Sequence, residues 1–390
     1  MSQRNIRLIS IIRFAQSFHL YIHAYALILL DRGLSLFQIT AIESLVIATI
    51  FVMEIPTGII ADRIGRKGAI VAAIGFNISA EFLFLFAKTY PMYIMVAILT
   101  GTGFAFASGA IEAMVYDSLP LEDRDNQMKK TMGQINSLAR LAFFISPIVG
   151  AFIIRDGAPE NYTLAIALTV MALLVALLVS LFLQEPASEW DADKPHSMTI
   201  LRDGIAELRG NPTLRRLTLL TIFTTPLTGM LIVTLAAPYL TLNGVSPFVI
   251  GMTLSIGSLF AVFTQRYAYK LETWLGQERA ILFLLLLPAL MYGVLALVSG
   301  SILPVVVIII MYATNEMKSP LFSAYQNGLI GSKNRATVLS IINMLLNLFV
   351  AIVSPLYAAI GMFSLPLAFL IIGCVIVLAV IVLGVPKLEG

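Results

Sequence analysis

Ionisable side chains interrupt the long apolar stretches of this sequence, and their chemistry is the first clue to function. They are Arg13, His19, His23, Glu43, Glu54, Glu81, Glu112, Arg140, Glu316 and Lys318. If the stretches lie in a lipid bilayer, each charge costs several kcal/mol unless it is paired or faces water. Each residue is therefore a candidate for binding a proton or a solute, or for pairing with an opposite charge.

Two cations and two carboxylates of the first half are expected at one depth. At a rise of 1.5 Å per residue, each lies roughly 8–14 Å from the end of its helix that is on the same side of the bilayer as the N-terminus. These four residues are Arg13, Glu54, Glu112 and Arg140. Such a set has two explanations, which stay open here. The charges neutralise one another as part of the structure, or the set binds a proton and breaks a pair during a functional cycle.

His19 and His23 are four residues apart, so a continuous helix would place them on one face. Histidine titrates near neutral pH, so the pair predicts either proton binding or hydrogen-bonded structural roles. No cysteine or acidic residue adjoins them in the sequence, so no metal site is expected.

The second half offers Asn315, Glu316 and Lys318 near the middle of one apolar stretch. Residues two apart on a helix point about 200° away from each other, so Glu316 and Lys318 cannot both face the same side. We expect Glu316 to be the functional group of the two and Lys318 to lie against a neighbouring helix. Asn343 and Asn347, four apart on the next stretch, add hydrogen-bonding groups to one face.

Twelve apolar segments position these side chains, and each is close to the 20 residues that cross a bilayer. They are residues 7–30, 37–61, 68–87, 92–116, 131–154, 162–183, 216–241, 247–269, 280–299, 302–329, 336–359 and 363–385. An even number places both termini on one side. Most of the 25 lysines and arginines fall in connections on that side, and the opposite loops hold only Arg32, Lys88 and Arg155. The termini are therefore expected in the cytoplasm.

The composition excludes several other classes of protein. Of 390 residues, 59% are hydrophobic and 12% charged, and the mean hydropathy is +0.92. Soluble domains are nearer half apolar and a quarter charged. A net charge of +3 does not suggest a nucleic-acid partner, and the single Cys374 rules out an intrachain disulfide. No phosphate-binding loop or hydrolase signature occurs, so we expect neither an enzyme nor a cofactor.

The longest polar segment divides the chain into two halves. We expect a six-helix bundle at 1–183, a cytoplasmic linker at 184–215 and a second six-helix bundle at 216–390. Within the linker, MTILRDGIAELRG forms either an amphipathic helix on the membrane surface or a plain tether. The halves also echo each other, because SGAIEAMVYDSL precedes SPIVGAF as SPLFSAYQNGL precedes SPLYAAI. Such repeats are typical of transporters whose two bundles rock around a central site.

One loop carries a family signature. The sequence GIIADRIGRKGAI supplies Gly58, Asp62, Arg63, Gly65, Arg66 and Lys67. It matches the G-x-x-x-D-R-x-G-R-K loop of the major facilitator superfamily, which the chain resembles along its whole length. Gly58 is expected to let two helices approach closely, and Gly65 to permit a tight turn.

The resemblance implies a role for this loop. Asp62 would face the N-terminal end of the eleventh span, near Ala336, and Arg66 would reach Asp117 at the end of the fourth. The cluster would then act as a latch between the two bundles on the cytoplasmic face when the carrier opens outward. The alternative is a basic turn that only fixes topology.

A second signature resembles the glycine-rich fifth span of drug:proton antiporters, G-x8-G-x3-G-P-x2-G-G. Gly133, Ala142, Ser146, Pro147, Gly150 and Ala151 stand at those positions, and generic packing explains them equally well. The fold implies that the fourth and tenth spans line the cavity and that the third lies outside. It therefore favours Glu112 and Glu316 for coupling and assigns Glu81 to packing. The antiporter arginine motif is missing from the fourth span, where GTGFAFASGA stands.

These observations predict an all-α membrane protein with twelve transmembrane helices in two pseudo-symmetric six-helix bundles. We expect a monomeric, multi-pass secondary transporter of the cell membrane that exports small amphipathic molecules by alternating access, coupled to protons. Its partners would be the solute, protons and the lipid bilayer. The alternatives are an importer or uniporter of a small polar nutrient, or a sensor or lipid-handling protein on the same fold.

Overall fold

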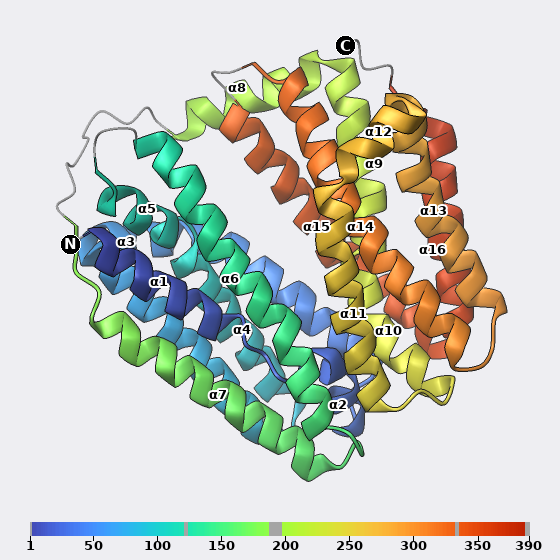
Figure 1. Cartoon of the computed structure of the whole chain (residues 1–390), viewed down its shortest axis with the longest axis horizontal. Helices are drawn as coiled ribbons and strands as arrows, with labels where there is room; N and C mark the ends of the chain where they lie inside the picture. Colours follow the sequence, from blue (N-terminus) through green and yellow to red (C-terminus); the bar gives the residue numbers. More distant parts are fainter. Residues whose placement is uncertain (1, 121–123, 187–196, 332–334, 387–390) are drawn as a thin grey trace. The chain divides into compact units, whose positions relative to one another are not determined.

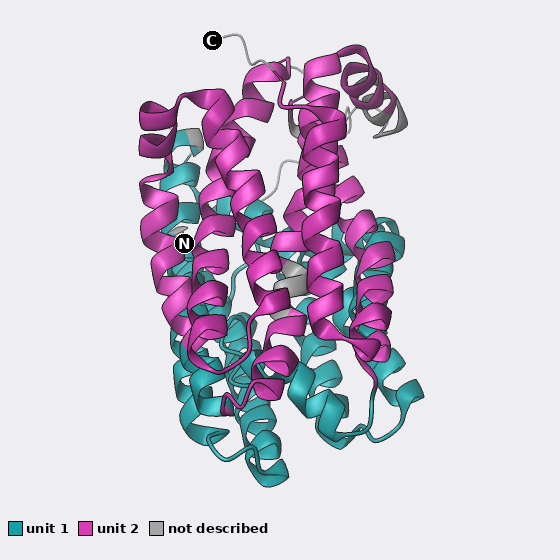
Figure 2. Cartoon of the chain, turned by 90° about the vertical axis from the view of Figure 1, so that its right-hand side faces the viewer, with its two compact units in different colours: residues 1–34, 41–190, 247–252 teal, residues 35–40, 191–246, 253–390 magenta. Residues whose placement is uncertain are grey.

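A computed structural model describes residues 2–120, 124–186, 197–331 and 335–386. Within these ranges the regular structure is helical, with no strand. The helices form two compact units (Figure 2). Unit 1 comprises residues 1–34, 41–190 and 247–252, and unit 2 comprises residues 35–40, 191–246 and 253–390.

Unit 1 contains the helices of the first half of the chain (Figure 1). They are α1 (Ser2–Gln16), the 3₁₀ helix η1 (Ile22–Ala24), α2 (Tyr25–Asp31), α3 (Leu36–Phe86), α4 (Tyr90–Ala107), α5 (Ala110–Ser118), α6 (Arg124–Ile153) and α7 (Pro159–Leu181). α1 packs against α5, α6 and α7. Ile12, Ile111 and Ile135 are buried in the apolar core that these helices share.

Unit 2 contains the helices of the second half, apart from residues 247–252, which belong to unit 1. They are α8 (Ser197–Gly210), α9 (Pro212–Thr228), α10 (Met230–Leu242), α11 (Pro247–Arg266), α12 (Ala268–Leu275), α13 (Gln277–Leu297), α14 (Ile302–Leu329), α15 (Arg335–Phe363) and α16 (Leu365–Leu383). Two starts are capped, because the Asn211 side chain accepts the amide of Leu214 and Ser364 that of Leu367. Leu217, Ile281 and Phe322 lie in a shared apolar core.

Nine helices of the described ranges have the length and composition to cross a membrane. α3 alone, with 51 residues, covers the expected segments 37–61 and 68–87, because Gly65 at φ 80° separates two helices there. Two further expected segments, 7–30 and 216–241, are helical but broken, and segment 92–116, which is one of the nine, is broken as well. The prediction of an all-α membrane fold with twelve spans in two bundles is confirmed.

The first expected span is not one continuous helix. α1 ends at Gln16, and turns precede η1. The backbone amide of Leu20 donates instead to Thr169 Oγ1 of α7, at 3.2 Å. The expectation that His19 and His23 share one helix face is therefore wrong, since His19 lies in the break and His23 in η1. A hydroxyl 149 residues away satisfies the freed amide, and no local periodicity reveals such a partner.

Glycine and proline mark the other two breaks. Gly109, at φ 73°, separates α4 from α5. Gly229 separates α9 from α10, three residues after Pro226. Proline supplies no amide to the helix, and the Thr224 hydroxyl donates to the Leu220 carbonyl one turn earlier, which favours bending.

The segment MTILRDGIAELRG is helical and packs on unit 2 as α8. A Cβ at Gly204 would lie 2.9 Å from side-chain atoms of both Thr337 and Ile341 of α15, so the two helices approach closely. Glu207 Oε1 accepts the amide of Gly331 at 2.7 Å. This segment is therefore packed structure, not a plain tether.

Candidate functional site

A carboxylate that lies more than 100 residues later in the sequence organises the turn at Gly65. Glu185, which follows α7, accepts the backbone amides of Arg66 at 2.6 Å and Lys67 at 2.8 Å. These amides begin the second helix of α3 and have no partner within it. The carboxylate therefore caps that helix and also lies at the positive end of its dipole.

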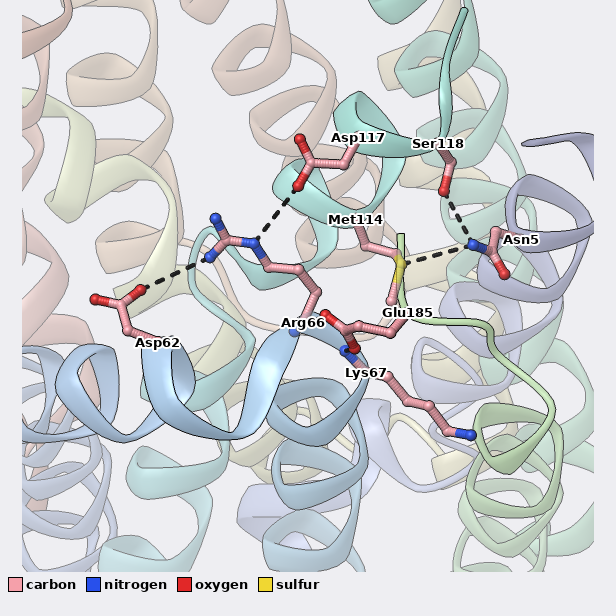
Figure 3. A network of polar contacts seen from close by, with 8 residues as sticks. All are labelled: Asn5, Asp62, Arg66, Lys67, Met114, Asp117, Ser118 and Glu185. Atoms are coloured by element: carbon pink, nitrogen blue, oxygen red, sulfur yellow. Dashed lines mark hydrogen bonds and ion pairs between the residues drawn. The ribbon is translucent and has the colours of Figure 1, made fainter. Parts of the chain in front are cut away.

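Arg66 joins this turn to the fourth span (Figure 3). Its Nε lies 3.7 Å from Asp117 Oδ2 near the end of α5, and its Nη1 lies 3.9 Å from Asp62 Oδ1. Lys67 Nζ donates to the Leu181 carbonyl at 2.7 Å. The structure thus brings Arg66, Asp117 and Asp62 together within unit 1, and the latch role stays a prediction.

Gly58 and Arg63 are less constrained than the motif suggests. No atom lies within 4 Å of the position that a Cβ at Gly58 would take, so no close approach of helices in unit 1 depends on this glycine. The expected reason for Gly58 is therefore wrong for unit 1. The side chain of Arg63 is exposed.

Asn5 cross-links the same end of unit 1 (Figure 3). Its Nδ2 donates to Ser118 Oγ at 3.0 Å and to the Gln184 carbonyl at 2.9 Å, and its Oδ1 accepts the Gln184 amide at 3.1 Å. The side chain is 2% exposed. The amide thereby holds the start of α1 against the end of α5 and the segment after α7.

The four charged residues expected at one depth do not all pair with one another. Arg13 is half-buried, and the side chains of Glu54, Glu112 and Arg140 are exposed. In the described ranges, no ion pair joins Arg13 to Glu54 or Glu112. Neutralisation by Arg13 therefore does not explain these two carboxylates. Glu112 lies in the first turn of α5, directly after the Gly109 break.

Glu81 of α3 has partners that the sequence did not indicate. The Tyr21 hydroxyl lies 2.7 Å and 2.6 Å from the two carboxylate oxygens, and His19 Nδ1 lies 3.8 Å from one of them. Phe84 stacks on the Tyr21 ring with centroids 5.4 Å apart. The break in the first span thus delivers a histidine and a tyrosine to a carboxylate that had been assigned to packing.

His23 is enclosed by small residues. It is 4% exposed, and neither ring nitrogen has a hydrogen-bond partner among the described residues. A Cβ at Gly150 would overlap the Leu20 carbonyl, and one at Gly251 would lie 2.9 Å from His23 Cδ2. The small residues of the fifth span therefore serve close packing at Gly150.

The remaining positions of the fifth-span signature differ from one another. Ala142, Ser146 and Ala151 are fully buried. Gly133 has open space beside it, so packing does not account for that glycine. Pro147 offers its carbonyl oxygen 2.9 Å from where a Cβ at Gly251 would lie.

In unit 2, the candidate residues take different environments. Lys318 is 2% exposed and donates to Thr224 Oγ1 of α9 at 2.5 Å, so it lies against a neighbouring helix. Asn315 Oδ1 accepts the Thr228 hydroxyl at 2.9 Å. Glu316 is half-buried, and Asn343 and Asn347 are exposed on α15.

The sequence reasoning overlooked Asn5, Tyr21 and Glu185. Each forms a hydrogen bond with a residue at least 60 positions away in the sequence. Asn5 and Tyr21 do carry a local signal, since each is a polar group in or beside an apolar run. Glu185 carries one as the first acid after the sixth span.

Two other features of the described ranges add no chemistry. No group of three or more His, Cys, Asp or Glu side chains there could hold a metal ion. A groove of about 780 Å³ between α13 and α16 is lined by aliphatic residues, glycines and Cys374. Such a lining suits contact with hydrocarbon and offers no polar recognition.

Relatives of this chain include multidrug resistance proteins of Bacillus subtilis (strain 168). Multidrug resistance protein 2 is 24% identical over 275 residues, which cover 70% of this chain and 67% of that protein. Multidrug resistance protein 1 is 32% identical over 125 residues, or 32% of this chain, and the match spans only 30% of that protein.

Solved structures share the fold. The nucleoside transporter NupG superposes with a TM-score of 0.78 at 13% identity, covering 98% of both chains. A D-xylose-proton symporter superposes with a TM-score of 0.74 at 16% identity, covering 100% of this chain and 98% of the other. The sequence profile of the Major Facilitator Superfamily matches residues 9–326. With its apolar helices and the motif around Gly65, the chain belongs to the Major Facilitator Superfamily and is a multi-pass membrane transporter.

Proposed function

We propose that this transporter exports small amphipathic molecules by alternating access, in exchange for protons. The observation that carries the proposal is the match to Multidrug resistance protein 2 over 70% of the chain. An amphipathic solute also suits a chain in which 59% of residues are hydrophobic, because such ligands are recognised mainly by apolar and aromatic surfaces with few polar groups.

The coupling group proposed for unit 1 is Glu112. Its carboxylate is exposed and has no hydrogen bond or ion pair among the described residues, so a proton or a cationic solute can reach it. The Gly109 break places it in the first turn of α5. Glu54 is also exposed.

The turn at Gly65 serves, in this proposal, as the latch that holds the cytoplasmic side closed when the carrier opens outward. Its support is the Arg66–Asp117 contact at 3.7 Å together with the Glu185 cap. The proposal also places the protein in the plasma membrane with both termini in the cytoplasm, as the basic connections indicate.

Transport by purified protein tests the proposal. Proteoliposomes loaded with the amphipathic cation ethidium are exposed to an imposed pH gradient, and dye fluorescence reports its movement. We expect movement against the dye gradient that nigericin abolishes. Dye flux that ignores the pH gradient would sink proton antiport. No dye flux, combined with uptake of a polar solute such as a nucleoside or a sugar, would favour the importer alternative.

Glu112→Gln tests the coupling group, with Glu160→Gln as control. Glu160 is likewise exposed in the first turn of a helix, α7. We expect Glu112→Gln to lower pH-driven transport at least tenfold, because the amide cannot exchange a proton, whereas Glu160→Gln behaves as wild type. Unchanged pH-driven transport in Glu112→Gln would remove this residue from the mechanism.

A further inference from the structure

Lys318 is a buried cation inside unit 2. Among the described residues, no other Lys, Arg, Asp or Glu is buried to this degree. Its Nζ donates to Thr224 Oγ1 at 2.5 Å and lies 5.1 Å from the centroid of the Phe322 ring. The Thr224 hydroxyl donates to the Leu220 carbonyl at 2.6 Å, so its oxygen is free to accept from the lysine.

No carboxylate compensates this ammonium in the part of the chain that the structure describes. An ammonium has three donors, and Lys318 finds one hydroxyl and one ring face. A charge withdrawn from water without a counter-ion costs several kcal/mol. The site is therefore poorly suited to a permanent cation. The desolvation cost disappears when the amine gives up its proton or when water reaches the ammonium.

The ionisable groups around Lys318 offer no substitute. α9, α10, α12 and α13 pack against α14, and α11 contacts it where the Thr264 hydroxyl donates to the Ala313 carbonyl at 2.8 Å. The ionisable side chains on these helices are Arg215, Arg216, Tyr239, Arg266, Tyr269, Lys270, Glu272, Glu278, Arg279 and Tyr292, and α14 itself adds Tyr312, Glu316 and Tyr325. None of the described residues in this set forms a hydrogen bond or ion pair with Nζ. Glu316 points about 200° away from Lys318 on the same helix.

Lys318 is the middle rung of a polar ladder between α9 and α14. Gln326 Nε2 donates to Thr221 Oγ1 at 3.3 Å on one side of it, and Thr228 donates to Asn315 at 2.9 Å on the other. The last rung adjoins the Gly229 break, since Asn315 Nδ2 lies 3.3 Å from where a Cβ at Gly229 would lie. The ladder can therefore open if α9 and α10 move separately about that break.

We propose that Lys318 is a proton-binding site of the transporter, which releases its proton when the ladder closes around the amine and takes one up from water when the ladder opens. The proton passes between Nζ and water, and no other bond changes. This inference rests on the proposed proton-coupled export and adds a coupling group in unit 2 to the carboxylate in unit 1. Two other roles are distinguishable from proton binding. A structural lysine would act only through its hydrogen bond to Thr224, and a fixed cation would act only through a permanent positive charge.

Two substitutions whose protonation state cannot change separate a proton-binding lysine from a structural lysine and from a fixed cation. Lys318→Met has an unbranched side chain one atom shorter than lysine and is always neutral, whereas Lys318→Arg is always charged in proteins. The matched control is Lys270→Met, because Lys270 also lies over an aromatic ring, Tyr267 at 4.7 Å, but is exposed. Each variant is assayed in proteoliposomes for ethidium transport driven by a pH gradient, and for ethidium exchange without one.

We expect both Lys318 variants to lose at least tenfold in pH-driven transport and to keep exchange, while Lys270→Met resembles wild type. Full pH-driven transport in Lys318→Arg would show that Lys318 acts as a fixed cation. Full pH-driven transport in Lys318→Met would show that its amine is dispensable. Either result overturns the inference.

If neither variant folds, Thr224→Val decides. It removes the acceptor, so the pH midpoint of transport shifts if Lys318 binds the proton, and an unchanged midpoint overturns the inference. Absence of pH-driven transport in the wild-type protein is a separate result, which refutes the proposed function itself.

Discussion

At the scale of single residues, Gly65 and Glu185 depend on each other. Gly65 adopts φ 80° and ψ 173°, a conformation that is essentially restricted to glycine and costs another residue about 1–3 kcal/mol. A Cβ at this position would also lie 2.7 Å from Glu185 Oε1. The turn is therefore restricted twice, once by the backbone angle and once by the carboxylate that caps the next helix.

A double-mutant cycle tests this dependence. Glu185→Ala is expected to cost about 1 kcal/mol of stability, as for loss of a helix cap. Gly65→Ala should destabilise more in the wild-type background than in Glu185→Ala, because the clash is gone there and only the backbone strain remains. Thermal unfolding of the purified protein in detergent measures both effects. Glu160→Ala, an exposed acid in the first turn of α7, should change little. Equal costs of Gly65→Ala in both backgrounds would contradict the contact.

At the scale of elements, broken spans give unit 1 and unit 2 their polar interiors. The break in the first span carries Tyr21 and His19 to Glu81. The break at Gly229 lies beside Asn315. A backbone that leaves the helix at membrane depth needs other partners for its amides and carbonyls, and it is tolerated only where protein or water supplies them.

Thr169 supplies that partner in the first span, so Thr169→Val is expected to destabilise unit 1. The substitution preserves shape but leaves the Leu20 amide unsatisfied, at a cost of about 1–3 kcal/mol. Thr163→Val on the same helix is the control, because both hydroxyls bond to a carbonyl one turn earlier but Thr163 is exposed. Thermal unfolding compares the two variants, and equal effects would refute a special role for Thr169.

At the scale of the whole molecule, the orientation in the membrane follows from the distribution of basic residues. An Arg63→Cys substitution in a Cys374→Ala background gives a single thiol at the turn, and Lys88→Cys gives one in the loop between α3 and α4. A membrane-impermeant maleimide added to intact cells is expected to label the second and not the first. Labelling at position 63 from outside would invert the topology and remove the latch from the cytoplasmic face.

The amino-acid sequence by itself determined where the twelve spans lie and which turn carries the family motif. Hydropathy over about 20 residues decides membrane insertion, and this sum needs no tertiary partner. The small residues around Gly150 and the tight turn at Gly65 were also legible, because backbone sterics act locally. The same local rules did not reveal that the first, fourth and seventh spans are broken.

Only the tertiary structure decided which polar groups meet. Tyr21 reaches Glu81 across 60 residues of sequence, Lys318 reaches Thr224 across 94, and Asn5 reaches Ser118 across 113. In an apolar environment each polar group gains most from whichever partner the packing of helices brings near, wherever that partner lies in the chain. Periodicity along one helix can show that such a group must be satisfied, but the packing of helices selects its partner.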